Sequence, residues 1–266
     1  MVLKRIITGI CMGIIVGIAI WLGNPLFLLV ACIAAALAVF EFYRIARHEN
    51  VQPLVYPGIF FTVLLVLQSI SPFPQTLPVL FVLLVVLPLV WVLFKHDKDS
   101  TFINVAWTIL GALYTGWMIS FYVNIRELRD GMGWTFLVLT CTAMCDVFAY
   151  AVGSRLGKHP LASSVSPGKT VEGAIGGIAG SMLFAVLLGT FFKLPLNHVG
   201  MILAGIVIGV FAEIGDLVES LLKRNMKAKD SGTILPGHGG LLDRIDSHLL
   251  VSPVAYFLIL LITKQG

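Results

Sequence analysis

Long apolar runs follow one another from residue 6 to residue 262, with only short breaks between them. The chain is 58% hydrophobic and 12% charged, whereas an average soluble domain is about 45–50% apolar and about 25% charged. A soluble fold could not bury so much apolar surface. The pattern therefore predicts an all-α polytopic integral membrane protein in which residues 1–266 form a single membrane domain.

The number of spans follows from the length of the runs, because a bilayer core of about 30 Å needs about 20 apolar residues per helix. We predict about nine transmembrane helices. They cover residues 6–22, 25–43, 57–71, 77–94, 101–123, 134–153, 171–192, 198–222 and 247–263. The third is short and is flanked by Pro57 and Pro72, but omitting it would disrupt the charge pattern described next.

The positive charges indicate the orientation, since cytoplasmic loops carry the excess of Lys and Arg. With a cytoplasmic N-terminus, fourteen of the 18 Lys and Arg residues fall on the cytoplasmic side and four on the other. We therefore expect a cytoplasmic N-terminus in a multi-pass protein of the inner (cytoplasmic) cell membrane. The net charge of +4 suits anionic membrane lipids and gives no indication of nucleic acid.

Two predicted cytoplasmic loops differ from the rest of the chain. They cover residues 153–170 and 223–246, and both are rich in Gly, Ser, Pro and charged residues. Residues 1–95 have almost no such content, so we interpret them as scaffold spans and residues 96–266 as the catalytic spans. Glu41, near the cytoplasmic end of the second span, is expected to be an ion-pair partner at the membrane surface.

Acidic side chains inside predicted spans need an explanation, because each costs about 2.5–3.5 kcal/mol to insert. Asp146 is one of them. Glu213, Asp216 and Ser220 lie three and four residues apart and share one face of a helix. Acids so close together would repel one another without a cation. The acids are not joined by a Cys or His cluster, so a hard, oxygen-seeking ion such as Mg²⁺ is the expected partner.

Residues 220–246 combine acids, bases and glycines. Lys223, Arg224 and Lys229 suit a polyphosphate, and carboxylates suit the metal ion that bridges it. The Pro-Gly-His-Gly-Gly run at residues 236–240 would let backbone amides approach phosphate oxygens closely. The combination predicts a phosphoryl- or nucleotidyl-transfer site on the cytoplasmic side. An ordinary positively charged loop would explain the bases, but not the glycines or the paired acids.

The same segment resembles the phosphatidate cytidylyltransferase (CDP-diacylglycerol synthase) family. It reads S-x-x-K-R, four residues, K-D-x-G, then L-P-x-H-G-G and D-R-x-D, with at least fourteen matching positions. The likeness covers roughly residues 140–250, including Asp146 and the Ser-Pro-Gly-Lys-Thr run at 166–170. The chain departs from the family at Val147, where a hydroxyl residue is common, and at residues 162–165, where another basic residue is common.

The resemblance implies transfer of CMP from CTP to phosphatidate, giving CDP-diacylglycerol and pyrophosphate for phospholipid biosynthesis. It implies a metal centre at Asp216 and Asp243 with Asp246 close by, and we assign all three to Mg²⁺. The catalytic residues would be Asp216, Asp243, Asp246 and Lys223. The nucleotide and phosphate ligands would be Asp146, Ser166, Lys169, Thr170, Ser220, Arg224, Lys229, Asp230, His238, Gly239, Gly240 and Arg244. A second cation and a homodimer stay open.

Two alternatives fit the residues less well, and a third fits them equally. An ion-coupled transporter would be expected to show repeat symmetry and broken helices, whereas the acids here gather beside a glycine-rich cytoplasmic loop. A CDP-alcohol phosphotransferase would show a D-G-x-x-A-R opening, which the sequence lacks. A cytidylyltransferase for a different lipid phosphate is not distinguished by sequence.

Overall fold

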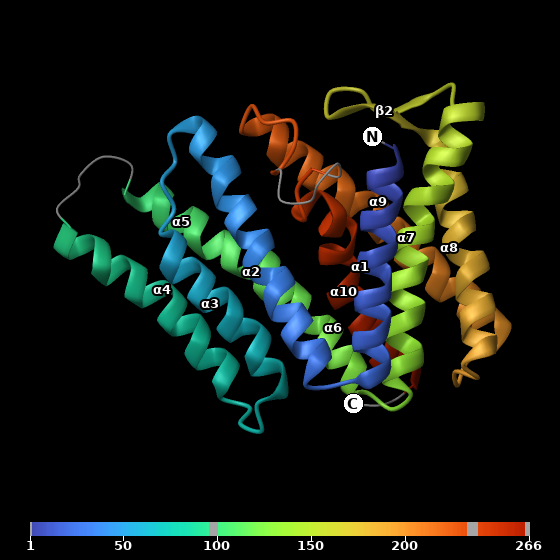
Figure 1. The fold of residues 1–266 in the computed structure, drawn as a ribbon, viewed down its shortest axis with the longest axis horizontal. Helices are drawn as coiled ribbons and strands as arrows, with labels where there is room; N and C mark the ends of the chain where they lie inside the picture. The colour runs from blue at the N-terminus through green and yellow to red at the C-terminus, as the bar shows by residue number, and fades with distance from the viewer. Residues whose placement is uncertain (1, 96–100, 233–238, 264–266) are drawn as a thin grey trace. The chain divides into compact units, whose positions relative to one another are not determined.

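The computed structural model describes residues 2–95, 101–232 and 239–263, and almost all of its regular structure is helical (Figure 1). The elements in chain order are α1 (Val2–Leu22), α2 (Leu26–Ala46), η1 (Arg47–Glu49), α3 (Val55–Leu67), η2 (Gln68–Ile70), α4 (Thr76–Lys95), α5 (Thr101–Gly111), η3 (Ala112–Trp117), α6 (Met118–Glu127), α7 (Gly131–Leu156), β1 (Pro160–Ala162), β2 (Ser166–Thr170), α8 (Val171–Phe191), α9 (His198–Asn225) and α10 (Leu242–Thr263). The turns η1 and η2 are 3₁₀ helices and η3 is a π-helical turn.

Seven helical segments in the described ranges are long and apolar enough to cross a membrane. They are Leu26–Glu49, Thr76–Phe94, Phe102–Glu127, Gly131–Leu156, Val171–Phe191, His198–Asn225 and Leu242–Thr263. Two shorter apolar helices, Thr8–Leu22 and Val55–Ile70, correspond to the first and third predicted spans. The prediction of an all-α polytopic membrane protein is confirmed. The count of nine spans and the cytoplasmic N-terminus stay predictions.

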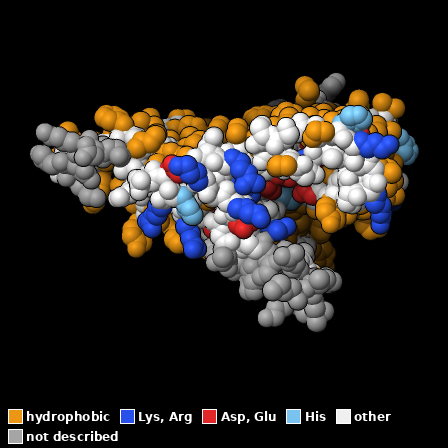
Figure 2. Space-filling model, turned by 90° about the horizontal axis from the view of Figure 1, so that it is seen from above, with side chains coloured by type: hydrophobic (Ala, Val, Ile, Leu, Met, Phe, Trp, Pro, Cys, Tyr) orange, Lys and Arg blue, Asp and Glu red, His pale blue; other side chains and the backbone are white. Residues whose placement is uncertain are grey.

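Exposed apolar side chains show why these helices suit a bilayer. On α4, for example, Val82, Leu87 and Leu93 are all exposed. Hydrophobic side chains are orange in Figure 2, where many of them reach the surface in view. A surface of this kind is stable against lipid, and a helix satisfies its own backbone hydrogen bonds there.

The chain forms two compact units, each built from two separate stretches. Unit one comprises residues 1–123 and 225–244, and unit two comprises residues 124–224 and 245–266. The described residues of 225–244 therefore belong with the N-terminal helices of unit one. The sequence-based division at residue 95 separates scaffold from catalytic spans by expected role, and it stays a prediction.

In unit one, Tyr43 fixes α2 against α3 and α5. Its ring is fully buried and its hydroxyl donates a hydrogen bond to the Thr108 carbonyl oxygen at 2.6 Å. The ring lies against Gly58 and Gly111, where an added Cβ would overlap it. α2 is therefore held at a fixed height and rotation, and Glu41, two residues before Tyr43, is held with it.

In unit two, small residues bring the helices close together. α7 and α8 lie side by side (Figure 1), and a Cβ added at Gly177 of α8 would come within 2.9 Å of the Cys145 carbonyl oxygen of α7. Gly215 of α9 packs in the same way against α10, where an added Cβ would lie 2.9 Å from the Ser247 Cα. Close backbone packing through small residues is typical of membrane helices, and here it brings acids from three helices together.

Both predicted cytoplasmic loops are partly regular. Within residues 153–170, α7 continues to Leu156, and β1 and β2 form an antiparallel hairpin. Within residues 223–246, α9 continues to Asn225 and α10 begins at Leu242. The charged residues at both ends of the second segment therefore project from helices, which fixes their spacing.

Candidate active site

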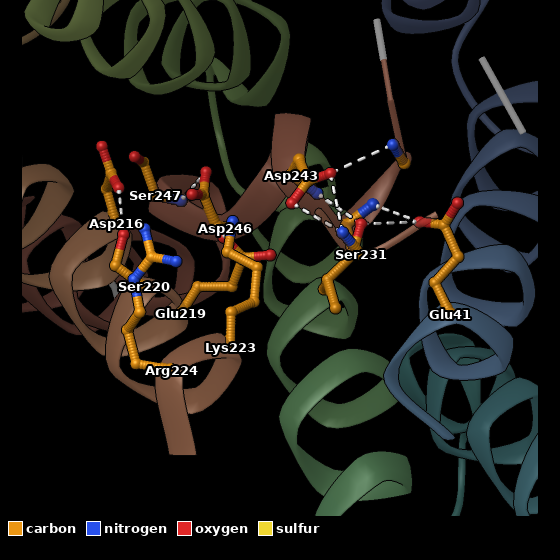
Figure 3. Close-up of polar contacts among 12 residues, drawn as sticks. Glu41, Asp216, Glu219, Ser220, Lys223, Arg224, Ser231, Asp243, Asp246 and Ser247 are labelled. Carbon is orange, nitrogen blue, oxygen red and sulfur yellow. Dashed lines mark hydrogen bonds and ion pairs between the residues drawn. The ribbon is translucent and has the colours of Figure 1, made fainter. Parts of the chain in front are cut away.

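The acids of α9 in unit two surround one lysine. The Lys169 Nζ atom lies 2.9 Å from Asp216 Oδ2 and 3.0 Å from Glu213 Oε2. Ser220 donates a 3.3 Å hydrogen bond to Asp216 Oδ1, one turn along the helix (Figure 3). The predicted shared face is confirmed. In this structure the cation among these acids is the ammonium group of Lys169, which lies in β2, the strand before α8.

Lys169 lies in β2, outside the apolar helices, and only 20% of its side chain is exposed. Burial disfavours its charge, but the nearby carboxylates of Asp216 and Glu213 outweigh burial and hold the pKa of Lys169 above its ordinary value. The ammonium group is therefore fully charged at neutral pH.

Two further acids join the cluster from α7 and α10. Asp246 is buried, accepts the Ser247 N–H at 2.8 Å and interacts electrostatically with Asp216. Ser247 also donates its hydroxyl to Asp146 Oδ1 at 3.4 Å. Figure 3 shows Asp216 of α9 near Asp246 and Ser247 of α10. Unit two thus gathers more negative than positive charge at one point, as a site that receives a cation would.

A pocket of about 250 Å³ opens beside this cluster. Asp146, Lys169, Glu213 and Asp216 line it together with the start of α8. Thr170 lines it too, and its Oγ1 accepts the Gly173 N–H at 3.1 Å as the N-cap of that helix. A helix N-terminus attracts anions. Pocket walls that combine an ammonium group, a helix N-terminus and carboxylates suit a phosphate group accompanied by a cation.

Two basic side chains at the end of α9 have partners within the protein. Lys223 Nζ lies 2.7 Å from Glu219 Oε2, whose side chain is fully buried, and Arg224 donates a hydrogen bond from Nε to the Val165 carbonyl oxygen at 3.3 Å. Arg224 thereby joins α9 to the β1–β2 hairpin. Both side chains have partners within the protein, and these contacts do not test their expected roles. The catalytic role of Lys223 and the phosphate-binding role of Arg224 stay predictions.

In unit one, Asp243 lies in the first turn of α10. Its carboxylate accepts the Ser231 N–H at 3.0–3.1 Å and the Gly240 N–H at 3.0 Å. Gly239, between these donors in sequence, has φ +85°, a conformation that favours glycine. The structure thus places Asp243, Gly239 and Gly240 together, and Figure 3 shows the dashed contacts to Asp243.

The remaining predicted ligands that the structure describes lie nearer the surface of the protein. Lys229, Asp230 and Arg244 are exposed, and Ser166 is half-buried in β2. His238 lies outside the described residues. Among the residues that the structure describes, no group of three or more His, Cys, Asp or Glu side chains is arranged to hold a metal ion. The Mg²⁺ prediction therefore depends on the all-carboxylate chemistry of the cluster.

Sequence reasoning misjudged Glu41 and overlooked Ser231. Glu41 is fully buried in α2, and its carboxylate accepts hydrogen bonds from Ser231 and Leu242. Its full burial contradicts the expected position at the membrane surface, and no ion pair of Glu41 is found within the described ranges. The acid within an apolar span could have indicated a buried polar contact. However, the sequence around Glu41 does not distinguish an acid at the surface end of a span from one in its interior.

Comparison with known proteins identifies the family. The model of the cytidylyltransferase family matches residues 3–262. The chain is 35% identical to a phosphatidate cytidylyltransferase of Bacillus subtilis and 31% identical to one of Synechocystis, each over 97% of both chains. It is 30% identical to a phosphatidate cytidylyltransferase of Staphylococcus haemolyticus over 90% of this chain and 92% of that one. The chain is a membrane nucleotidyltransferase and belongs to the cytidylyltransferase family.

Proposed function

We propose that this enzyme transfers CMP from CTP to phosphatidate, forming CDP-diacylglycerol and pyrophosphate. The names of its relatives give the two substrates. The observation that carries the proposal is the pocket of unit two, where Lys169 faces Glu213 and Asp216 at the start of α8. This pocket has the charges that a nucleotide phosphate with its cation requires.

In the proposed reaction, an oxygen of the lipid phosphate forms a bond to the α-phosphorus of CTP. The bond from that phosphorus to the bridging oxygen of the β-phosphate breaks, and the electron pair leaves with pyrophosphate. A phosphate monoester is already anionic at pH 7, so no strong general base is needed. The chain has to orient two anions against each other, which is the main part of catalysis in phosphoryl transfer.

Lys169 and the N-terminus of α8 are proposed to bind and orient the phosphates in the pocket. The ammonium group is pre-positioned by Asp216 and Glu213, so little side-chain entropy is lost when an anion arrives. Thr170 fixes the first turn of α8 and so the direction of its backbone N–H groups. We propose that Ser166, Ser220, Arg224, Lys229, Asp230, His238 and Arg244 contribute further phosphate contacts.

Mg²⁺ is the proposed cofactor. Its fit depends on the donor set, which is made of carboxylates without Cys or His, as a hard cation prefers. Asp216 and Asp246 would hold it in unit two, where they interact electrostatically. When bound, the ion would neutralise charge on the nucleotide phosphates. Asp243 of unit one remains a candidate ligand from sequence, and a second cation and a homodimer also remain predictions.

The site is proposed to face the cytoplasm of a cell whose inner membrane holds the chain. The uneven distribution of Lys and Arg supports this orientation. CTP would then reach the pocket from the cytoplasm, and phosphatidate from the surrounding lipid.

The activity is tested by incubating the purified chain with radiolabelled CTP, phosphatidate and Mg²⁺, and then extracting lipid. Labelled CDP-lipid is expected. If phosphatidate receives no label while another lipid phosphate does, the proposed substrate is wrong. If no lipid phosphate is labelled by active, folded protein, the proposed reaction is wrong.

The residues are tested by Asp216→Asn and Asp243→Asn, each of which is expected to abolish turnover in protein that stays folded in detergent. Asp130→Asn is the matched control. Asp130 is an exposed acid with φ +58° before α7, and Asn tolerates that conformation well. Retained activity in either test variant removes that residue from the proposed site.

A further inference from the structure

Glu41 is an acid of the N-terminal scaffold spans. It directly contacts the segment of residues 223–246, here called the catalytic segment, which carries Asp243. It is fully buried in α2. Its Oε2 atom accepts the Leu242 N–H at 2.8 Å and the Ser231 hydroxyl at 3.3 Å. Both donors belong to the part of unit one that carries Asp243, and Figure 3 shows Glu41 directed at Ser231.

Glycines allow the segment to pack tightly around this carboxylate. A Cβ added at Gly232 would lie 2.5 Å from Glu41 Oε1, and one added at Gly240 would lie 2.6 Å from Glu41 Oε2. The backbone therefore approaches the Glu41 carboxylate closely at two places, Gly232 and Gly240. Such close approach is possible only where no side chain intervenes.

Ser231 connects Glu41 to Asp243. The Ser231 hydroxyl donates a hydrogen bond to Glu41, and the Ser231 Oγ atom accepts one from the Asp243 N–H at 3.3 Å. Its own N–H donates to the Asp243 carboxylate at 3.0–3.1 Å. Glu41, Ser231 and Asp243 thus form one hydrogen-bonded chain, so a displacement of Glu41 would be passed to the Asp243 carboxylate.

The Glu41 carboxylate is costly for the fold. Its Oε1 atom is buried and has no hydrogen-bond partner among the described residues. A buried acceptor without a partner is unfavourable for folding, because it has lost its hydrogen bonds to water. A group kept at such a cost in a span calls for a role beyond packing.

We propose that Glu41 is a positioning residue for the reaction. It anchors Ser231 and Leu242, and through them sets the orientation of the Asp243 carboxylate. The scaffold spans would then contribute directly to the geometry of the catalytic segment. The effect on rate depends on the proposed function, but the effect on the segment does not.

Hydrogen exchange of the substrate-free protein tests the anchoring. In Glu41→Ala, peptides containing Ser231 and residues 239–243 should exchange at least about tenfold faster, as expected when hydrogen bonds to a charged group are lost. Glu41→Gln keeps an acceptor oxygen of the same shape, so it should stay within about threefold of the parent chain. Peptides from residues 124–224 should be unchanged. Exchange that is unaltered in Glu41→Ala overturns the proposal.

Glu49→Gln is the matched control. Glu49 follows α2 and its carboxylate lies 3.0 Å from Lys227 Nζ, so it contacts the same part of the chain without touching the Ser231 network. Peptides around Ser231 in Glu49→Gln should exchange at the same rate as in the parent chain. An increase around Ser231 equal to that of Glu41→Ala would mean that any acid contact holds the segment, which contradicts a specific role for Glu41.

Turnover separates positioning from general stability. Glu41→Ala should lower kcat about tenfold or more with little change in the KM for CTP, and Glu41→Gln should restore most of it. Ser231→Ala should cause a similar loss, and the double variant should lose no more than the larger single loss, because the residues act in one chain. Additive losses overturn the proposal. If the parent chain makes no CDP-lipid, the proposed function fails while the exchange result still decides the anchoring.

Discussion

Replacing Lys169 by Met would remove the positive charge from the acid cluster of unit two while keeping an apolar side chain of similar length. Glu213 and Asp216 would then face each other without the ammonium group that now lies 3.0 and 2.9 Å from them. We expect Lys169→Met to be both inactive and less stable.

The exposed fractions of the three side chains set the size of the effect. Glu213 is 10% exposed, Lys169 20% and Asp216 31%. Breaking a buried ion pair costs about 3–5 kcal/mol, and an exposed pair contributes about 0–1 kcal/mol. The pairs of Lys169 lie between these limits, so we expect a loss of about 2–4 kcal/mol. Taking about 2–4 °C per kcal/mol for a chain of this size, the midpoint of thermal unfolding should fall by roughly 5–15 °C.

A second substitution distinguishes charge from packing. Adding Glu213→Gln to Lys169→Met removes the uncompensated buried charge, and removing both partners of a buried pair is often nearly neutral. Thermal unfolding in detergent should therefore show that the double variant recovers most of the lost stability. Its activity should not return, because Lys169 is proposed to bind phosphate. A single variant as stable as the parent chain, or a double variant no more stable than the single one, would refute the reasoning.

Three further predictions concern the packing and the cofactor. Gly215→Ala should lower kcat more than about tenfold, because the added Cβ would lie 2.9 Å from the Ser247 Cα and displace α10. Gly17→Ala is the control, since a Cβ added there would have nothing within 4 Å. Equal activity of the two variants would contradict this prediction. Thr170→Val should destabilise the protein by about 1 kcal/mol through loss of the cap on the Gly173 N–H, measured as a lower unfolding midpoint, and an unchanged midpoint would count against the cap. Removal of divalent ions by EDTA should abolish labelling of lipid, and Mg²⁺ should restore it; labelling that persists in EDTA would exclude the proposed cofactor.

The acids of α9 show how much a sequence can predict about this site. Helical periodicity placed Glu213 and Asp216 on one face, and both contact Lys169 in the structure. Periodicity describes one helix at a time, so it could not reveal that Lys169, 44 residues before Glu213, supplies the cation between them. That contact depends on the packing of α7, α8 and α9.

The ends of the helices show a different limit. Hydropathy ended the eighth span at residue 222, because the apolar run stops there, whereas α9 continues to Asn225 through Lys223 and Arg224. Lys and Arg are good helix formers, so leaving the apolar region does not end the helix. Glu41 was misjudged for a similar reason, since its partners are determined by tertiary packing and its immediate neighbours in sequence are apolar in either case.

The discontinuous make-up of unit one has a consequence for biosynthesis. Glu41 and Ser231 are separated by 190 residues, which a ribosome adding about 5–20 residues per second needs roughly 10–40 s to produce. During that interval α2 has been made but the donors of Ser231 and Leu242 have not. An acidic side chain within a span is costly without polar partners, so we expect the nascent α2 to reach its final position only after Ser231 and Leu242 have been made. The unit that contains the first helices of the chain is therefore completed only after most of the chain has been made.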